Sequence, residues 1–518
     1  MSKTFRDFPN NTADRWWKDP SLRKNVACAF ISYWGGFCLG YDGSYLNGLQ
    51  SLTTWNEYFD SPSGNRLGLI SAMSYIPSLA LLPLYSLSCD YLGRRVTSLI
   101  GCVLLMAGAL IGTFAKKGDG MLIAGRAIVG VAGSLITLSC NLLCNETLHP
   151  RLRSIGGAFF LVFYYTGAIV SAWTSYAVIA AGWTSDWSWR LPTLLQIVGP
   201  AIVFFGTFFI PESPRWLIAR GKRDAAHKIL ADQHANGKMD DELVLHELEE
   251  IEEAIAREKR EKLGFTSFLK TKGNRHRLLI LATTATGSQG NGVAVFSYYL
   301  TPVLKLVGVT DPAQQTGING GMQIWNLLLA VFGASMVEKL GRRPLWLGST
   351  AGMLISYICL IGLSGGFANT NSESVGLASV AFMFFCYGAY DIAWTPLAYS
   401  YSTEVLPFSM RASGMSFFVW MQNATLCINQ WVNPIALEKA GWKYYFIFLA
   451  ALIVYLIIIY FSFVETKGLA LEEVALLFDN TTEGLSLGDK KEAVDAGVKH
   501  ANKGAIRHLE EADDKDSV

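Results

Sequence analysis

The sequence predicts an all-α protein that crosses a membrane about twelve times. Of its 518 residues, 51% are hydrophobic and only 16% are charged, and the mean hydropathy is +0.28. A soluble chain of this length would divide into several domains with a larger charged fraction, so these values favour a protein with many membrane spans. The net charge of +1 provides no basic surface for nucleic acid, and no nucleic-acid partner is expected.

Apolar runs define the expected spans. A helix needs roughly 20 apolar residues to cross the hydrocarbon, where irregular backbone cannot satisfy its hydrogen bonds. The runs begin near Asn25, Leu67, Val96, Met121, Ile155, Leu191, Leu278, Thr316, Leu345, Val375, Ala412 and Trp442. The chain therefore divides into an N-terminal segment 1–24, a six-helix half 25–210, a central loop 211–277, a second six-helix half 278–464 and a tail 465–518.

Basic residues predict the orientation of these spans. Short cytoplasmic loops are enriched in Lys and Arg, and the basic span ends of this chain fall on one side, with Lys116 and Lys117 as the main exception. We expect both termini and the central loop to be cytoplasmic, in a multi-pass protein of the plasma membrane. The first residues lack an apolar run, so no removable signal peptide is expected. The charged central loop is expected to be a helical spacer, and a regulatory docking surface is the alternative.

The cysteines and the usual catalytic motifs point away from an enzyme. All nine cysteines lie in or beside apolar runs, without a CxxC pair or a His/Cys cluster, which favours small span residues over disulfides or a metal site. No nucleophile set, Walker motif or phosphate-cradling glycine loop is present. We expect no enzymatic activity, no cofactor, no metal and no ATP-driven pumping.

Three motifs occur twice, in the same order and at equivalent span ends, which indicates two homologous halves. The pairs are Asp90-x3-Arg94-Arg95 with Glu338-x3-Arg342-Arg343, Glu146-x6-Arg153 with Glu404-x6-Arg411, and Pro211-Glu212-Ser213-Pro214-Arg215-Trp216 with Val464-Glu465-Thr466-Lys467-Gly468.

With these motifs together, the chain resembles the sugar porter family of the major facilitator superfamily, from Asn25 to Gly468. GYDGSYLNGLQ in the first span and NQWVNPIAL after the eleventh are similar to fungal members, nearest the lactose and cellobiose permease branch. The resemblance implies two six-helix halves of inverted three-helix repeats, with a substrate site near the bilayer midplane and transport by alternating access. It implies a sugar substrate and a monomer in the lipid bilayer.

The repeated charges are candidates for a gate. A Glu and an Arg seven positions apart at a helix end stay at the membrane surface, where the carboxylate can pair with arginines of a neighbouring helix. The resemblance implies that such a network closes the inner gate while the outside is open. The alternative is that these charges only set the topology, which explains the arginines but not the spaced acids. The expected gating residues are Asp90, Arg94, Arg95, Glu146, Arg153, Glu212, Glu338, Arg342, Arg343, Glu404, Arg411 and Glu465.

Asp42 and Arg126 lie within apolar runs, where an ionisable side chain is costly and suggests a function. They match the Asp and Arg that proton-coupled sugar porters place together, whereas facilitative glucose carriers have an amide in place of Asp42. We expect sugar–proton symport, with facilitative uniport as an alternative. A static buried pair is less favoured, because buried ion pairs contribute little to stability.

Sugar recognition needs amides, hydroxyls and an aromatic face in a cavity. By the resemblance, the expected substrate-binding residues are Gln289, Asn326, Asp391, Tyr399, Tyr298, Tyr299, Gln422 and Asn423. Other positions depart from the hexose-carrier pattern, with Leu161, Ala294, Ser288 and Asn423 in place of its glutamines, asparagine and tryptophan. We therefore expect a wider or different cavity, in which a disaccharide is an alternative to a hexose.

A sugar sensor that does not transport is the alternative from another functional class. Sensors of this family typically carry a long cytoplasmic tail for signalling partners. The tail here has only about fifty residues, which favours a carrier.

Overall fold

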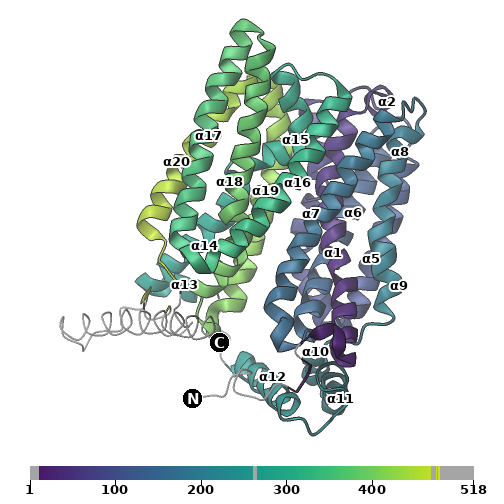
Figure 1. Cartoon of the computed structure of the whole chain (residues 1–518), viewed down its shortest axis with the longest axis vertical. Coiled ribbons are helices and arrows are strands. Elements are labelled where there is room, and N and C mark those ends of the chain that lie inside the picture. The colour runs from purple at the N-terminus through teal and green to yellow at the C-terminus, as the bar shows by residue number, and fades with distance from the viewer. Residues whose placement is uncertain (1–10, 14, 261–264, 468–473, 475–476, 479–518) are drawn as a thin grey trace, which may run out of the picture.

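The computed structural model describes residues 11–13, 15–260, 265–467, 474 and 477–478, which form a helical bundle without a strand. Figure 1 shows two groups of long helices side by side, with a set of short helices at the lower end. Residues 1–10 of the predicted N-terminal segment and most of the predicted tail lie outside the described residues.

The first half contains the helices that follow one another before the central loop. These are α1 (Pro20–Ser51), α3 (Gly64–Ala72), α4 (Ile76–Leu92), α5 (Arg94–Thr113), α6 (Gly120–Thr147), α7 (Pro150–Ala180), α8 (Trp187–Leu194), η3 (Leu195–Ile197) and α9 (Val198–Thr207), with the short η2 (Trp16–Lys18) and α2 (Thr53–Tyr58). Gly40 of α1 faces the backbone of Tyr164 in α7, where a larger residue would collide. This close approach brings the middle of α1 beside the middle of α7.

The second half repeats this arrangement with one broken helix. Its members are α13 (Ser267–Lys270), α14 (Lys272–Gly290), α15 (Val293–Leu306), α16 (Pro312–Leu340), α17 (Arg342–Thr370), α18 (Glu373–Val405), α19 (Phe408–Ala440), η4 (Gly441–Tyr444) and α20 (Tyr445–Ser462). Asn291 and Gly292 separate α14 from α15, and the break leaves unwound backbone in the interior of the bundle. Broken helices of this kind occur in membrane proteins where the backbone is buried or lines a solute path.

In the part of the chain that the structure describes, twelve segments cross the bundle, as the sequence predicts. Among the described residues, nine ranges are long and apolar enough to span a membrane, and one of them, Ser413–Ser462, contains both α19 and α20. The segments outside these ranges are α1 and the α14–α15 pair, which carry more polar residues. These segments therefore fall below the hydropathy expected of a membrane span because they carry polar residues, and they still cross the bundle.

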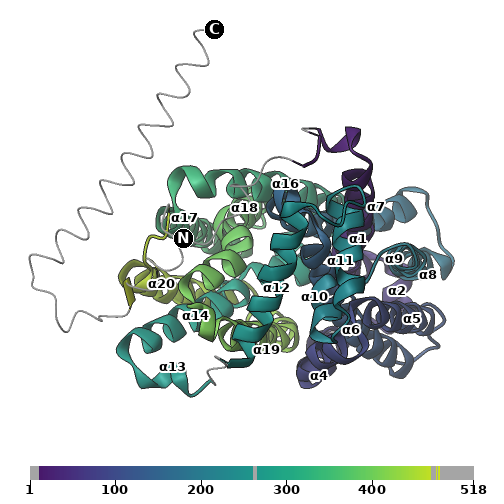
Figure 2. The same ribbon diagram turned by 90° about the horizontal axis from the view of Figure 1, so that it is seen from below.

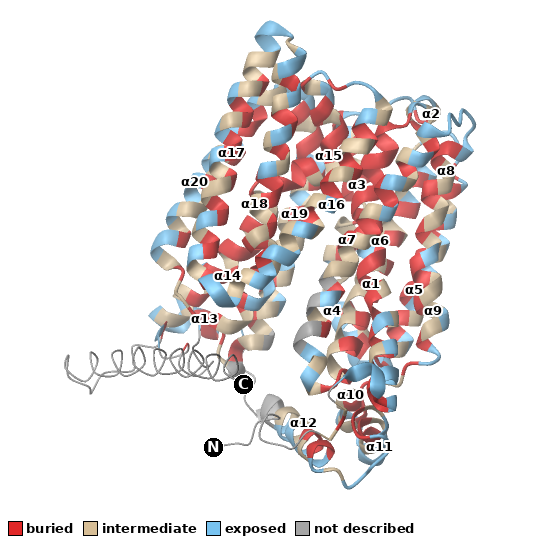
Figure 3. Ribbon diagram, viewed as in Figure 1, coloured by how far each residue is buried: buried red, intermediate tan, exposed pale blue. Residues whose placement is uncertain are grey.

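The halves are joined at the end remote from the short helices. The Asn47 side chain of α1 donates to the Ser297 carbonyl at 2.6 Å and accepts from the Leu300 amide at 2.9 Å. Ser51 of α1 and Thr301 of α15 share a 2.7 Å hydrogen bond. Buried residues are dense at this end of α3, α15 and α16 (Figure 3), and the helices diverge towards the other end (Figure 1).

The central loop folds into α10 (Pro214–Ala219), α11 (Arg223–His234) and α12 (Glu242–Arg260), as predicted for a helical spacer. Leu217, Leu230, Val244 and Leu248 form a small apolar core of their own within it. Seen from below, α10 and α11 lie beneath the first half and α12 extends towards the second (Figure 2). We call the end of the bundle that carries these helices the basic end, because the repeated arginines lie there.

A buried polar cluster fixes the central loop to the first half. Both ring nitrogens of His234 in α11 face oxygen atoms, with Glu247 of α12 at 2.6 Å and the Thr147 carbonyl at 3.0 Å. Glu247 also pairs with Arg153 of α7 at 3.3 Å. The His149 ring packs edge-on against His234 at 5.0 Å and accepts from the Arg151 amide, which caps α7.

Burial keeps His149 neutral. Loss of solvation lowers its pKa from 6.5 to about 3, and His234, Arg151 and Arg153 act in the same direction against the opposite effect of Glu247. Burial would raise the pKa of Glu247, but His234, Arg153 and His149 hold it below its ordinary value. Both pKa values are depressed in the docked state, so the undocked state binds more protons and docking weakens as the pH falls. The His149 contribution is lost from pH 6.5 downward.

We expect acidification from pH 7.5 to 5.5 to raise the opening equilibrium of α11 and α12 about tenfold, because His149 takes up a proton only when exposed. Amide hydrogen exchange of α11–α12, corrected for the intrinsic rate, measures this opening. His149→Asn is the matched control, since the amide oxygen keeps the helix cap but does not titrate. Equal pH sensitivity in the wild type and in His149→Asn would contradict this origin.

Candidate transport site

Asp42 and Arg126 form an ion pair between α1 and α6. Arg126 Nη1 donates to Asp42 Oδ1 at 2.5 Å, and only 5% of the arginine side chain and 15% of the aspartate side chain are exposed. Gln196 of η3 donates to the same carboxylate oxygen at 3.2 Å. The guanidinium also lies 5.4 Å from the centre of the Tyr45 ring, a cation–π distance. The two residues predicted to couple protons are therefore in direct contact and nearly dry.

Asp391 of α18 is fully buried and accepts hydrogen bonds from both halves. The Tyr165 hydroxyl of α7 and the Thr395 hydroxyl each donate to Oδ1 at 2.7 Å. The Asn326 amide nitrogen of α16, turned towards the carboxylate, donates to Oδ2 at 3.2 Å. Two predicted substrate residues, Asn326 and Asp391, are thus brought together, and Tyr165 adds a contact from the first half.

A second polar group joins α14, α18 and α19. Tyr399 donates to Gln422 Oε1 at 2.7 Å, and Gln422 Nε2 donates to the Ser288 hydroxyl at 3.0 Å. Tyr390 donates to the Ser288 carbonyl at 3.0 Å. The Tyr399 side chain remains 44% exposed, and its ring packs edge-on against Phe418 at 5.1 Å. Two further predicted residues, Tyr399 and Gln422, are therefore in contact.

The remaining predicted substrate residues make other contacts. The Asn423 side chain donates to the Val419 carbonyl of its own helix, at 2.8 Å. Tyr299 is fully buried and its hydroxyl donates to Gln430. These two residues are therefore held by their surroundings.

Tyr298 and Gln289 lie at the edge of the polar groups. Tyr298 is half-buried and packs edge-on against Tyr75, with ring centres 6.3 Å apart. The Gln289 carbonyl, beside the helix break, accepts from Asn429 at 2.6 Å. The side chain of Leu161, predicted to replace a polar sugar contact, lies outside the described residues, and that of Ala294 is buried.

Sequence reasoning missed Tyr165, Thr395 and Gln196. A tyrosine or threonine in a span is most often a packing residue, so neither stood out from its neighbours. The sequence spacing could have pointed to Thr395, because it follows Asp391 by one helical turn and residues so spaced share a helix face. Gln196 was the better candidate, as a lone amide in the apolar stretch LLQIVGP.

The repeated charges form a first-half cluster at the basic end. Arg94 donates to both oxygens of Glu146 at 3.0 and 3.1 Å, and lies 3.7 Å from Asp90. Glu212 accepts the backbone amides of Arg94 and Arg95 at 3.1 and 3.2 Å. A carboxylate at this place satisfies the free amides at the start of α5, and its negative charge interacts favourably with the positive end of the helix dipole.

A second-half cluster reproduces these contacts almost atom for atom. Arg342 donates to Glu404 at 3.2 and 3.0 Å and to Glu338 at 2.8 Å, and Glu465 accepts the amides of Arg342 and Arg343 at 2.9 and 3.0 Å. The glycine before each helix has a positive φ, +92° at Gly93 and +94° at Gly341, and a side chain there would collide with the capping Glu. The local fold therefore requires the Gly-Arg-Arg motif twice.

The two arginines of the Glu-x6-Arg motifs lie outside these clusters. Arg153 contacts the Leu148 carbonyl and Glu247, and Arg411 donates to the Leu406 carbonyl at 3.4 Å. Within the described part of the chain, no ion pair joins the two halves, and only the pair of Arg153 and Glu247 joins a half to the central loop. Ten of the twelve predicted gating residues are thus gathered into two separate clusters.

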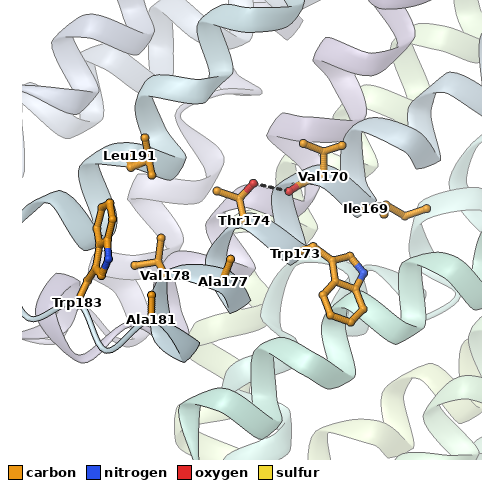
Figure 4. A pocket seen from close by; sticks show the side chains of 9 residues that line it. All are labelled: Ile169, Val170, Trp173, Thr174, Ala177, Val178, Ala181, Trp183 and Leu191. Atoms are coloured by element: carbon orange, nitrogen blue, oxygen red, sulfur yellow. Dashed lines mark hydrogen bonds between the residues drawn. The ribbon is translucent and has the colours of Figure 1, made fainter.

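A pocket of about 610 Å³ on α7 is a poor fit for a sugar. Figure 4 shows Trp183 on one side and Trp173 with Ile169 on the other, with Ala177, Val178 and Ala181 between the two tryptophans. Its one side-chain hydroxyl, Thr174, donates to the Val170 carbonyl of its own helix at 2.7 Å. Apart from the indole N–H groups of Trp173 and Trp183, the lining offers a polyhydroxylated solute no hydrogen-bonding side chain, and it has no free acceptor side chain.

The chain is similar to known fungal transporters. It is 27% identical to an MFS-type transporter of Aspergillus cristatus, over 88% of this chain and 93% of that protein. It is 26% identical to a high-affinity glucose transporter of Kluyveromyces lactis, over 88% and 85%, and 26% identical to a quinate permease of Neurospora terricola, over 87% and 88%.

Solved structures share the fold. The inward-open conformation of the xylose transporter XylE from E. coli superposes with a TM-score of 0.71 at 20% identity, covering 88% of this chain and 100% of that chain. The sequence model of the family described as sugar (and other) transporter matches residues 28–478. The chain therefore belongs to the sugar (and other) transporter family, whose members with this major facilitator fold are membrane transporters and not enzymes.

Proposed function

We propose that this chain is a proton-coupled sugar symporter that works by alternating access. It acts as a monomer in the plasma membrane, with the basic end and both chain termini in the cytoplasm. The observation that carries the proposal is the dry Asp42–Arg126 ion pair between α1 and α6. A buried ion pair is weak as a source of stability, and an ionisable group in a span is a functional candidate.

The coupling follows from electrostatics. While the side chains are 2.5 Å apart, the guanidinium stabilises the ionised carboxylate. If movement of the halves separates them, an ionised Asp42 would lie in a low-dielectric interior without a cation, so it takes up a proton instead. The carrier loads the proton from the more acidic outside and releases it to the cytoplasm when the pair forms again.

The solute is expected between the halves, at the polar groups around Asp391 and Gln422. Their carboxylate, amide and hydroxyl groups suit a sugar, and the exposed ring of Tyr399 offers an aromatic face. With Leu161 and Ala294 in place of polar contacts, the site suits a solute larger than a hexose as well as a hexose, and a beta-linked disaccharide should compete at least as well as glucose.

The two charged clusters at the basic end act as gate elements. Each holds its half as a rigid unit through charge-assisted hydrogen bonds, and closure of this end brings the units together. In the observed state, the hydrogen bonds between the halves among the described residues lie at the opposite end, around Asn47 and Ser51 and between α3 and α19, with one bridge at mid-depth from Tyr165.

Asp42→Asn should abolish accumulation of sugar against a gradient, because the amide cannot carry the coupled proton, while downhill exchange persists. The measurement is radiolabelled uptake, with and without a protonophore, in cells that lack their own carriers. A panel of glucose, xylose, lactose, cellobiose and a polyol identifies the sugar first. Asp119→Asn is the control, since the ion pair of Asp119 with Arg66 lies at the end of the bundle opposite the basic end, away from Asp42.

Protonophore-sensitive accumulation by Asp42→Asn would rule out Asp42 as the coupling residue. Uptake without accumulation in the wild type would indicate a facilitative uniporter, and no uptake at all would indicate a sensor.

Glu404→Gln should lower the maximal uptake rate about tenfold, because the amide loses charge-assisted bonds to Arg342, while the KM changes less. Glu146→Gln, the equivalent change in the first half, should behave alike. Glu252→Gln, in the exposed pair with Arg223, serves as the control and should be unchanged. Wild-type rates in both cluster variants, at matched surface expression, would refute the gating role.

A further inference from the structure

Asp42, Arg126 and Asp391 are the charged residues of the polar groups described above. The first two neutralise each other. Asp391 has no Lys, Arg or His within ion-pair distance in the described part of the chain. With all three ionised, the interior between the halves carries an excess negative charge at Asp391.

Three hydrogen-bond donors take the place of a cation at Asp391 and suit its ionised form, whereas Asp42 away from Arg126 would keep only Gln196. Tyr165 and Thr395 each donate a hydroxyl proton at 2.7 Å, and the Asn326 amide donates at 3.2 Å. All three partners are neutral donors. An ionised carboxylate only accepts hydrogen bonds, so a partner that replaces one of these three must itself be a donor. A hydroxyl of a bound solute supplies such a donor, whereas a carboxylate of a solute cannot.

The bond from Tyr165 is distinct because it crosses between the halves. Tyr165 lies in the middle of α7, Asp391 lies in the middle of α18, and both side chains are buried. Thr395 and Asn326 belong to the second half and move with Asp391. Tyr165 is therefore the only one of the three donors that must leave Asp391 when the halves move apart at this depth.

We propose that Tyr165 is a positioning residue that selects the solute: in the empty carrier it holds Asp391 across the halves, and a hydroxyl of a neutral polyhydroxylated solute takes its place. The charge of Asp391 then excludes solutes that bear a carboxylate. This inference rests on the proposed function as a carrier. It distinguishes two kinds of solute that the names of the relatives suggest, a neutral sugar and the hydroxylated carboxylate quinate.

Uptake kinetics in cells without their own carriers test the proposal. In the wild type, unlabelled glucose or cellobiose should inhibit uptake of the labelled sugar, and quinate at equal concentration should not. Asp391→Asn removes the charge but keeps an acceptor for Tyr165, so inhibition by quinate should strengthen about tenfold relative to that by the sugar. Wild-type inhibition by quinate as strong as that by the sugar would overturn the selection against anions.

Tyr165→Phe tests the positioning role. The solute no longer has to displace a phenol from Asp391, so the KM for sugar should fall about tenfold, while loss of the bridge alters the maximal rate separately. A residue that only stabilises the fold would not lower the KM. Tyr164→Phe, one position away and facing Gly43 of α1, is the matched control and should be unchanged. An unchanged or raised KM in Tyr165→Phe would contradict the displacement.

The uptake assay gives different results if this inference is wrong and if the proposed function is wrong. Wild-type cells that take up quinate in place of every neutral sugar would overturn the inference but leave the carrier intact. Wild-type cells that take up none of these solutes would overturn both. If Tyr165→Phe does not reach the membrane, the sugar-to-quinate comparison in the wild type and in Asp391→Asn decides the proposal.

Discussion

Hydrocarbon offers no hydrogen-bond partner, so each ionisable group inside this bundle must be satisfied by the protein itself. Asp42 and Arg126 satisfy each other, with Gln196 as a further donor. Asp391 is satisfied by neutral donors alone, one of them from the opposite half. Movement of the halves would change which partners are available to Asp42 and Asp391, so proton binding and solute binding would depend on the conformation of the carrier. In the proposed transport cycle, a proton replaces Arg126 at Asp42 and a solute hydroxyl replaces Tyr165 at Asp391.

The charged clusters at the basic end follow another rule. They lie at helix ends, where a carboxylate both caps the free amides of the next helix and pairs with its arginines. The same atoms meet in both halves, from Glu212 and Arg94 in the first to Glu465 and Arg342 in the second. Each half is thus tied internally at this end. The hydrogen bonds that join the halves occur mainly at the other end, around Asn47. This distribution suits two rigid bodies that rock about a midplane site.

Much of this arrangement could be predicted from the sequence. The repeat of Gly-Arg-Arg and Glu-x6-Arg predicted charged pairs at one end of each half, and the contacts of Arg94 with Glu146 and of Arg342 with Glu404 agree with it. The ion pair of Asp42 could also be expected, since two opposite charges in spans need each other.

The contacts of Tyr165 and of Arg153 could not be predicted in the same way. A tyrosine in an apolar run has a sufficient explanation in packing, and only the close approach of α1 and α7, with the position of α18, shows what its hydroxyl meets. Arg153 pairs with Glu247 through a tertiary contact between α7 and α12, which no sequence spacing encodes. Long-range pairings of this kind depend on how complete helices dock.

In the proposed transport cycle, the partner of Asp42 changes between the guanidinium of Arg126 and a proton. Proton binding by the purified carrier tests it most directly. A pH indicator in weakly buffered solution records protons taken up when the transported sugar is added. The account predicts uptake of up to one proton per bound sugar in the wild type and none in Asp42→Asn. No proton uptake in the wild type, or the same uptake in both proteins, would contradict it.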